Sequence, residues 1–464
     1  MLTRTLQILY ILVPPHTSTV LVCGAHTIQS KSKDNSMAYQ EKTTTGYGKR
    51  LTNSIKGIVG GFIFFGIGTL ILFLNEGNFV KTQRALKEAQ GNTTSIADVS
   101  RVDAELNGKL IHATALADTK DELRDAMFGV NTVAIMLERQ VEYYQYVETS
   151  TTRTEDKIGG GEVTTTEYHY SQKWTDSPQD SSEFHDPDFK KSNSVLTTVD
   201  AKKQWATNVS FGGYKLPEFL IKSMTGSTPA KVSMTNEQFQ EWEKVLNKNA
   251  PAPEPPAEPA PVEIQLELKL DADAQVPPAA PPAPMFVHVI GNVVYLGKSP
   301  NNPQIGDLRI TLTQVMPAEI SIIAKVVGST FEKYSASNNK DVWRLEMGAK
   351  SAESMYQSAH SDNKLLAWVL RFIGAICVIC GLKGIFNIVV TLFKVLPFLA
   401  DIVGIGVGLI CFVVGFAWSL LIISIAWLTY RPLIGIPLVI AAIGGIVYLK
   451  KVAAKKKAES PVNG

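Results

Sequence analysis

The sequence predicts a multi-pass α-helical membrane protein with four transmembrane helices and a large β-rich α+β domain. This domain is expected outside the cytoplasm, inserted between the first and second helices. Three observations lead to the prediction. Uncharged stretches of the chain are long enough to cross a hydrocarbon core of ~30 Å. Basic residues flank these stretches, whereas the segment between them is acidic. That segment also alternates apolar and polar residues, as half-buried β-strands do.

Composition agrees with this class. Of 464 residues, 45% are hydrophobic and only 19% are charged. Soluble domains carry about 25% charged residues, so the composition argues against a disordered or coiled-coil chain. The length allows two or three domains.

The first 36 residues admit two interpretations. Arg4 followed by Leu6–Val13 is similar to a signal peptide, but Pro14 and Pro15 interrupt the apolar run. Alternatively, translation starts at Met37 and residues 1–36 are an upstream extension. Residues 37–56 then form a basic cytoplasmic N-terminus.

Four transmembrane spans are expected from the uncharged stretches. The second contains Arg371, Lys383 and Lys394, and is the least regular. A short cytoplasmic turn near Pro397 is the preferred link to the third span, but a hairpin that returns without crossing stays open. The spans are residues 57–75, 365–396, 402–429 and 432–449, followed by a basic cytoplasmic tail, residues 450–464.

Charge predicts the orientation. Residues 76–364 contain 29 basic and 39 acidic residues, whereas the rest of the chain contains 16 basic and 4 acidic residues. Basic residues mark cytoplasmic flanks, so both ends are expected in the cytoplasm and residues 76–364 outside it. The acidic domain argues against nucleic acid as a partner, which requires a basic face. The basic ends favour contact with anionic membrane lipid.

Charged residues in or beside the spans are candidates for function, because an ionisable group within a membrane is costly. The candidates are Arg371, Lys383 and Arg431. The alternative for Lys383 is that its side chain extends to the cytoplasmic headgroups.

Small residues suggest helix contacts. Gly57 and Gly61, and Gly404 and Gly408, form G-x-x-x-G pairs, which allow close helix packing. We therefore expect these four glycines to take part in helix packing, including packing between copies.

The domain is expected to be mainly β-structure. Residues 141–147 and 163–174 alternate on either side of Gly159-Gly160-Gly161, which predicts a long hairpin. Residues 236–247 have helical spacing of apolar side chains. Further strands are expected at 109–116, 285–296, 308–315 and 319–327, and a Pro/Ala/Glu-rich insertion at 250–284.

No catalytic motif is found. The chain lacks the nucleophile-elbow, zinc-protease and phosphate-loop patterns, and its seven histidines are scattered. Cys377 and Cys380 form a C-x-x-C within an apolar run, where small buried hydrophobic residues are expected rather than a redox or zinc site. We expect no enzymatic activity, no cofactor and no metal.

Several short motifs, each present once, follow one another over residues 57–449. They are Asn75-Glu76-Gly77 with Lys81-Thr82, Gly108-Lys109-Leu110-Ile111-His112, Val141-Glu142 with Tyr144-Gln145-Tyr146-Val147-Glu148, Tyr168-x-Tyr170 with Trp174, Gly306-Asp307-Leu308-Arg309, Trp368-x-Leu370-Arg371-x-x-Gly374 with Pro397, Asp401 and Gly406, and Trp427-Leu428-x-Tyr430-Arg431-Pro432-Leu433. In this order they resemble the LUMA (transmembrane protein 43) family. Residues 1–36 and 250–284 have no counterpart in that family, and the insertion's composition suggests a bacterial member.

The resemblance implies four spans and a large lumenal or periplasmic loop. Animal members of the family lie in the endoplasmic reticulum and inner nuclear membrane, self-associate and organise protein complexes; no catalytic activity is attributed to them. For this chain it implies an integral membrane protein, in the bacterial inner membrane if prokaryotic. The leading hypothesis is a scaffold whose partners are itself, as a homo-oligomer, and other membrane or extracytoplasmic proteins.

Two further hypotheses stay open. Arg371 and Lys383 favour a transporter or channel component. A membrane-bound enzyme acting on lipid or envelope polymer rests only on the size of the domain.

Overall fold

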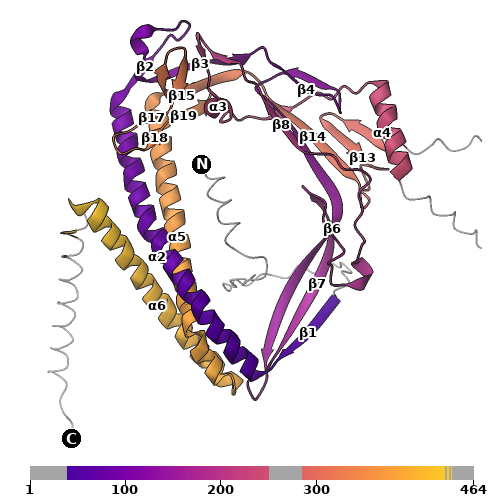
Figure 1. Ribbon diagram of the computed structural model, residues 1–464, viewed down its shortest axis with the longest axis vertical. Helices are drawn as coiled ribbons and strands as arrows, with labels where there is room; N and C mark the ends of the chain where they lie inside the picture. Colours follow the sequence, from indigo (N-terminus) through magenta and orange to yellow (C-terminus); the bar gives the residue numbers. More distant parts are fainter. Residues whose placement is uncertain (1–38, 250–284, 434–435, 438–439, 441–464) are drawn as a thin grey trace, which may run out of the picture. The chain divides into compact units, whose positions relative to one another are not determined.

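Three long helices dominate the computed structural model, which describes residues 39–249, 285–433, 436–437 and 440 (Figure 1). They are α2 (Tyr47–Asn92), α5 (Ala352–Phe393) and α6 (Pro397–Tyr430), and they pack against one another. Each is long and apolar enough to cross a membrane, by length and composition. The expected fourth span, residues 432–449, lies mostly outside the described residues, as do residues 1–36, the insertion 250–284 and the tail 450–464.

The helices are longer than the spans expected from hydropathy. α2 begins before residue 57 and continues well beyond residue 75, so that its apolar part is only the middle of one continuous helix. α5 likewise begins before residue 365. It ends at Phe393, and Pro397 starts α6 after a short turn. Proline suits the first turn of a helix because its missing N–H is not needed there.

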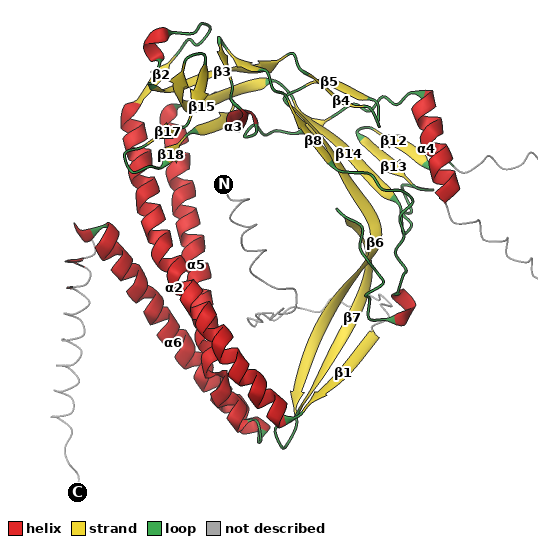
Figure 2. Cartoon of the chain, viewed as in Figure 1, coloured by secondary structure: helices red, strands yellow, loops and turns green. Residues whose placement is uncertain are grey.

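The rest of the described chain is rich in β-strands, most of which lie between α2 and α5 in sequence (Figure 2). Short helical elements are η1 (Ala104–Leu106), η2 (Pro187–Phe189), α3 (Glu218–Ile221) and α4 (Asn236–Asn249). The strands are β1 (Tyr39–Thr45), β2 (Thr93–Ile96), β3 (Leu110–Thr119), β4 (Glu122–Asp125), β5 (Val130–Val133), β6 (Met136–Asp156), β7 (Glu162–Thr175), β8 (Lys202–Trp205), β9 (Val209–Phe211), β10 (Tyr214–Lys215), β11 (Thr228–Pro229), β12 (Val287–Ile290), β13 (Val293–Leu296), β14 (Leu308–Val315), β15 (Ala318–Val327), β16 (Thr330–Glu332), β17 (Tyr334–Ser335), β18 (Asp341–Val342) and β19 (Arg344–Met347).

The first sheet is an antiparallel sheet built on the long hairpin of β6 and β7. Its strand order is β1-β7-β6-β14-β13-β12, with β8 beside β6 and β11 beside β14. Apolar side chains from β6, β13 and β14 form one core, which α4 covers through Phe239, Trp242 and Leu246. Beyond Val147 the hairpin loses this core and continues as a polar ribbon of β6, β7 and β1.

The second sheet closes on itself. Its pairings run from β3 to β15, β16, β10 and β9 and return to β3. Two further strands extend this ring: β2 pairs with β3, and β19 pairs with β15. Closure removes the free edges of these five strands. Phe211, Tyr214, Ile322 and Phe331 are among the buried side chains that fill this small barrel.

Helices α2 and α5 continue into the β-rich region. Ala85, Leu86 and Ala89 of α2 share a hydrophobic core with Met355 and Tyr356 of α5. The same core contains Leu110 of β3 and Ile323 of β15. The helices and the barrel therefore bury apolar surface against each other.

Most expected strands are confirmed. The hairpin forms with its turn at the expected glycines, where Gly159 and Gly160 have φ angles of 91° and 84° that favour glycine. The expected strand 285–296 is two strands, because Gly291 makes a turn between β12 and β13. Strand β1 was not expected: residues 39–45 were assigned to a cytoplasmic N-terminus, yet they pair with β7 from Tyr39↔Tyr168 to Thr45↔Glu162.

Close packing of α2 on α5 yields a first prediction. A Cβ added at Gly61 would lie 2.7 Å from the carbonyl oxygen of Gly381, whereas one at the neighbouring Gly60 would meet nothing within 4 Å. We expect Gly61→Ala to lower the free energy of unfolding by about 1–3 kcal/mol, because the two backbones must separate. The matched control Gly60→Ala should be neutral or stabilising by up to about 1 kcal/mol, since alanine is the better helix former.

The measurement is denaturant unfolding of both variants in the same detergent. Equal stability of the two variants would contradict the close contact.

Candidate functional site: a buried ion pair shared by three helices

A carboxylate lies buried between the three long helices. Glu76 of α2 has a side chain that is 0% exposed, and its partner Arg371 of α5 is 13% exposed. The Nε–H of Arg371 donates to Oε1 of Glu76 at 2.6 Å, and Nη2 donates to Oε2 at 2.8 Å. This two-pronged geometry is the strongest form of the arginine–carboxylate contact.

The third helix completes the site. The indole Nε1–H of Trp427, on α6, donates to Oε2 of Glu76 at 2.7 Å. The guanidinium carbon of Arg371 also lies 4.9 Å from the ring centroid of Trp368 and 5.7 Å from that of Phe79, within the range of cation–π attraction. One carboxylate on α2 thus binds donors from both other helices.

Neighbouring polar groups also bridge helices. Asn75 donates to the carbonyl of Ala367 at 3.0 Å, and Asn363 donates to the carbonyl of Phe79 at 3.2 Å. Arg84 of α2 donates to the carbonyl of Tyr430 at 2.8 Å, which satisfies a backbone acceptor at the end of α6.

The site lies at one end of the apolar stretch. Glu76 directly follows the uncharged residues 57–75 of α2. Trp368, Trp427, Tyr430 and Arg431 come from the same end of the bundle, and Trp and Tyr are typical of the membrane–water boundary. We therefore place the ion pair at this boundary.

The arrangement is suited to holding helices rather than to reacting with a substrate. Both carboxylate oxygens of Glu76 accept hydrogen bonds, and its charge is balanced by Arg371. A buried charge left without its partner is strongly destabilising, so the contact fixes the rotation of α5 and α6 about α2.

The predicted charge candidates have different surroundings. Arg371 is paired as described. Arg431 follows α6, and its guanidinium carbon lies 5.2 Å from the ring centroid of Phe79. Lys383 is exposed on α5, and no acidic group among the described residues forms an ion pair with it.

The predicted glycine pairs pack within the chain. Gly61 contacts α5 at Gly381, and Gly57 lies farther off, with 3.9 Å between a Cβ built there and the carbonyl oxygen of Gly384. Gly404 and Gly408 face α5 more loosely, near Val390 and Lys383.

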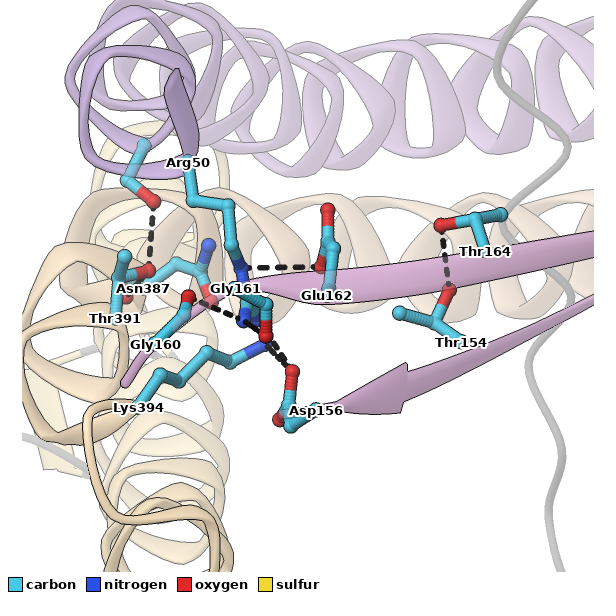
Figure 3. Close-up of polar contacts among 11 residues, drawn as sticks. Arg50, Thr154, Asp156, Gly160, Gly161, Glu162, Thr164, Asn387, Thr391 and Lys394 are labelled. Carbon is cyan, nitrogen blue, oxygen red and sulfur yellow. Dashed lines mark hydrogen bonds and ion pairs between the residues drawn. The ribbon is translucent and has the colours of Figure 1, made fainter. Parts of the chain in front are cut away.

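A second polar cluster lies at the start of α2 (Figure 3). The side chain of Arg50 is 4% exposed and pairs with Asp156 at 2.6 Å and Glu162 at 3.1 Å, at the tip of the β6–β7 hairpin. Its Nη1 also donates to the carbonyl of Gly160 at 3.0 Å. Lys394, after α5, lies 3.5 Å from the same Asp156 carboxylate.

Sequence reasoning predicted Arg371 but missed its partners Glu76 and Trp427. It also missed Arg50 and the two carboxylates that pair with it, Asp156 and Glu162. Glu76 marked the end of a span and belonged to one motif, but no partner was predicted for it. One signal was present, because Glu76, Arg371 and Trp427 belong to three of the short motifs described above. Glu76 is 295 residues from Arg371 and 351 residues from Trp427 in sequence, and the three motifs meet at this one site.

Within the described ranges, no group of three or more His, Cys, Asp or Glu side chains is placed to hold a metal ion. Cys377, Cys380 and Cys411 are free thiols on α5 and α6.

Comparison with known proteins gives consistent matches. The family model described as "Transmembrane protein 43" matches residues 143–432. The chain is 25% identical to transmembrane protein 43 of Homo sapiens over 424 residues, covering 89% of this chain and 94% of the human protein. It is 25% identical to the Rattus norvegicus protein over 400 residues, covering 84% and 88%, and 22% identical to a Drosophila melanogaster homolog over 397 residues, covering 84% and 93%. No solved structure matches the chain.

The shared ion pair yields a second prediction. Removal of one partner leaves a buried charge unpaired, so we expect Arg371→Met or Glu76→Gln to lower the free energy of unfolding by about 3–5 kcal/mol. The double variant should lose much less than the sum, because neither charge then remains buried alone.

A double-mutant cycle of denaturant unfolding in detergent measures this coupling. Arg431→Met is the control, since Arg431 forms no ion pair among the described residues and should be nearly additive with Glu76→Gln. Additive losses for Glu76 and Arg371 would contradict the pairing.

Proposed function

Because the chain belongs to the transmembrane protein 43 family, we propose that it is a non-enzymatic integral membrane scaffold. In this role it self-associates and organises protein complexes through its β-rich domain, which lies outside the cytoplasm. The acidic balance of residues 76–364 and the basic residues before the apolar part of α2 support this orientation. A bacterial chain would place the domain in the periplasm, and a eukaryotic one in the lumen of the endoplasmic reticulum or nuclear envelope.

The observation that carries the proposal is the shared core of helices and barrel. Tyr356 of α5 is 1% exposed in this core, and its hydroxyl lies 2.6 Å from Oγ1 of Thr93, where β2 begins. Glu88 of α2 accepts hydrogen bonds from the Tyr334 hydroxyl at 3.0 Å and from the backbone N–H of Ser337 at 2.9 Å. A domain fixed in this way keeps one orientation relative to the helices.

The bundle supports the same role. Its buried ion pair and its glycine contacts join the helices. Large apolar side chains such as Ile405, Leu409 and Phe416 of α6 stay exposed, at 75%, 63% and 50%. They provide a surface for lipid or for other membrane helices.

A second candidate function has one observation in its favour. Lys383 is exposed on α5, ten residues before the helix ends, with no ion-pair partner among the described residues. A charge in a membrane-spanning helix also occurs in transporters and channels.

The scaffold proposal predicts association in native membranes. We expect amine-reactive cross-linking of membranes to give dimers or larger species of the full chain and to recover other proteins with it. A chain with residues 98–348 replaced by a flexible linker is the control: it should stay in the membrane after alkaline extraction but lose those other proteins. A strictly monomeric chain that cross-links to nothing would refute the scaffold.

The alternative predicts ion or solute flux. If the chain conducts, liposomes containing it should show flux that is lost in Lys383→Leu and kept in Lys383→Arg, since only the charge matters. Absence of flux in every ionic gradient would exclude this second function.

A further inference from the structure

The hairpin tip joins two segments that the charge pattern assigns to the opposite side of the membrane from the domain. Besides the ion pairs of Arg50 and Lys394 with Asp156, the backbone N–H of Gly159 donates to the carbonyl of Val395 at 3.0 Å. Strand β1 extends this contact, because all of its residues pair with β7. We call this set of contacts the tip contact.

The tip contact and the Glu76 site lie at opposite ends of the apolar zone. They are separated by 26 residues of continuous helix, from Arg50 to Glu76, or about 39 Å at 1.5 Å per residue. A hydrocarbon core of ~30 Å fits between them. Ser54 and Thr391, whose hydroxyl oxygens are 2.7 Å apart, show that α5 accompanies α2 across this interval.

The hairpin covers the same interval outside the bundle. β6 has 21 residues, or about 70 Å when extended, and it runs from the barrel core at Met136 to the tip at Asp156. With the tip contact closed, the polar ribbon reaches past the apolar zone of the helices (Figures 1 and 2).

The ribbon is unsuited to hydrocarbon. Residues 150–155 of β6 are exposed Ser, Thr, Arg and Glu, and threonines pair across it, as at Thr152 and Thr166 with 3.4 Å between hydroxyl oxygens. Lipid offers no partners for such side chains or for the open backbone edge of β1. A lipid-embedded bundle and a closed tip contact therefore exclude each other.

We propose that the tip contact is a latch, closed while the three helices are outside a bilayer and opened by their crossing of it. The closed latch holds the start of α2 and the α5–α6 turn beside the domain. This inference goes beyond the scaffold role and rests on the helices crossing the membrane.

The charges of the latch explain how a membrane opens it. In the closed form, Asp156, Glu162 and the Gly160 carbonyl surround the Arg50 guanidinium (Figure 3). Lipid phosphates offer the same chemistry, anionic oxygens for Arg and Lys. Anionic headgroups therefore compete with the tip for Arg50 and Lys394, helped by the nearby Lys49 and Lys56.

Disulfide cross-linking tests the latch. The reporter is Thr43→Cys with Thr164→Cys, which are register partners on β1 and β7. The matched control is Thr152→Cys with Thr166→Cys, partners within the hairpin that stay together in both states. The four native cysteines are replaced by alanine, and the oxidised fraction is read from the gel shift with a polymer-linked maleimide after denaturation.

In native membranes we expect the reporter to oxidise at least about tenfold more slowly than the control, because the polar ribbon cannot stay beside the helices in lipid. For the full chain held without lipid in an amphipathic polymer, both pairs should oxidise at similar rates. Asp156→Asn with Glu162→Gln should slow the reporter there and leave the control unchanged.

Two results would overturn the latch. Reporter oxidation as fast as the control in native membranes would show that the contact persists in lipid. Slow oxidation in both environments, with a normal control, would show that the contact does not form. Neither result affects the cross-linking test of the scaffold, so the two proposals fail separately.

Discussion

The packing of the helices depends on one buried carboxylate that must be paired with a positive charge. Glu76 is fully buried, and an unpaired ionised carboxylate in such a place would cost several kcal/mol. Arg371 and Trp427 satisfy it only if α5 and α6 present particular faces to α2 at one level. The glycines of α2 and α5 then meet farther along the same contact, where Gly61 and Gly381 bring the two backbones together.

The same two helices connect this site to the β-rich region. α2 carries Glu76 in its middle and Leu86 in the core shared with the barrel, only ten residues later. In α5 the order is reversed: Tyr356, in the core shared with the barrel, comes first, and Arg371 of the ion pair follows. Because both helices are continuous over this interval, the ion pair and the barrel core belong to one rigid unit, which is the physical basis of the scaffold proposal.

Local patterns in the sequence predicted much of this fold. Alternation marked β6, β7, β14 and β15, and glycines marked the hairpin turn, because these features are set by neighbouring residues. Hydropathy located the apolar parts of α2, α5 and α6 but not their ends, since a helix continues into the polar region when tertiary contacts satisfy it. Strand β1 was not predicted because Lys42 and the threonines of this strand make both of its faces polar. Its partner strand β7 is also more than 100 residues away in sequence.

The candidate site was predictable only in part. Arg371 stood out as a charge within a span, but nothing local shows that its partner is Glu76, 295 residues earlier. The glycine pairs were expected to join copies of the chain as well, and in the structure Gly61 is occupied by α5. Such pairings depend on how helices are arranged, and spacing along one helix does not determine that.

The unbroken length of α2 has a mechanical consequence. Its 46 residues form a rod of about 69 Å, of which fewer than half fit within a hydrocarbon core. A helix adjusts to bilayer thickness by tilting, and a tilt of about 10° displaces one end of such a rod by about 12 Å relative to the other. The barrel is packed on that end of α2. The thickness of the surrounding membrane determines the tilt of the helix, and the tilt therefore sets where the whole β-surface lies.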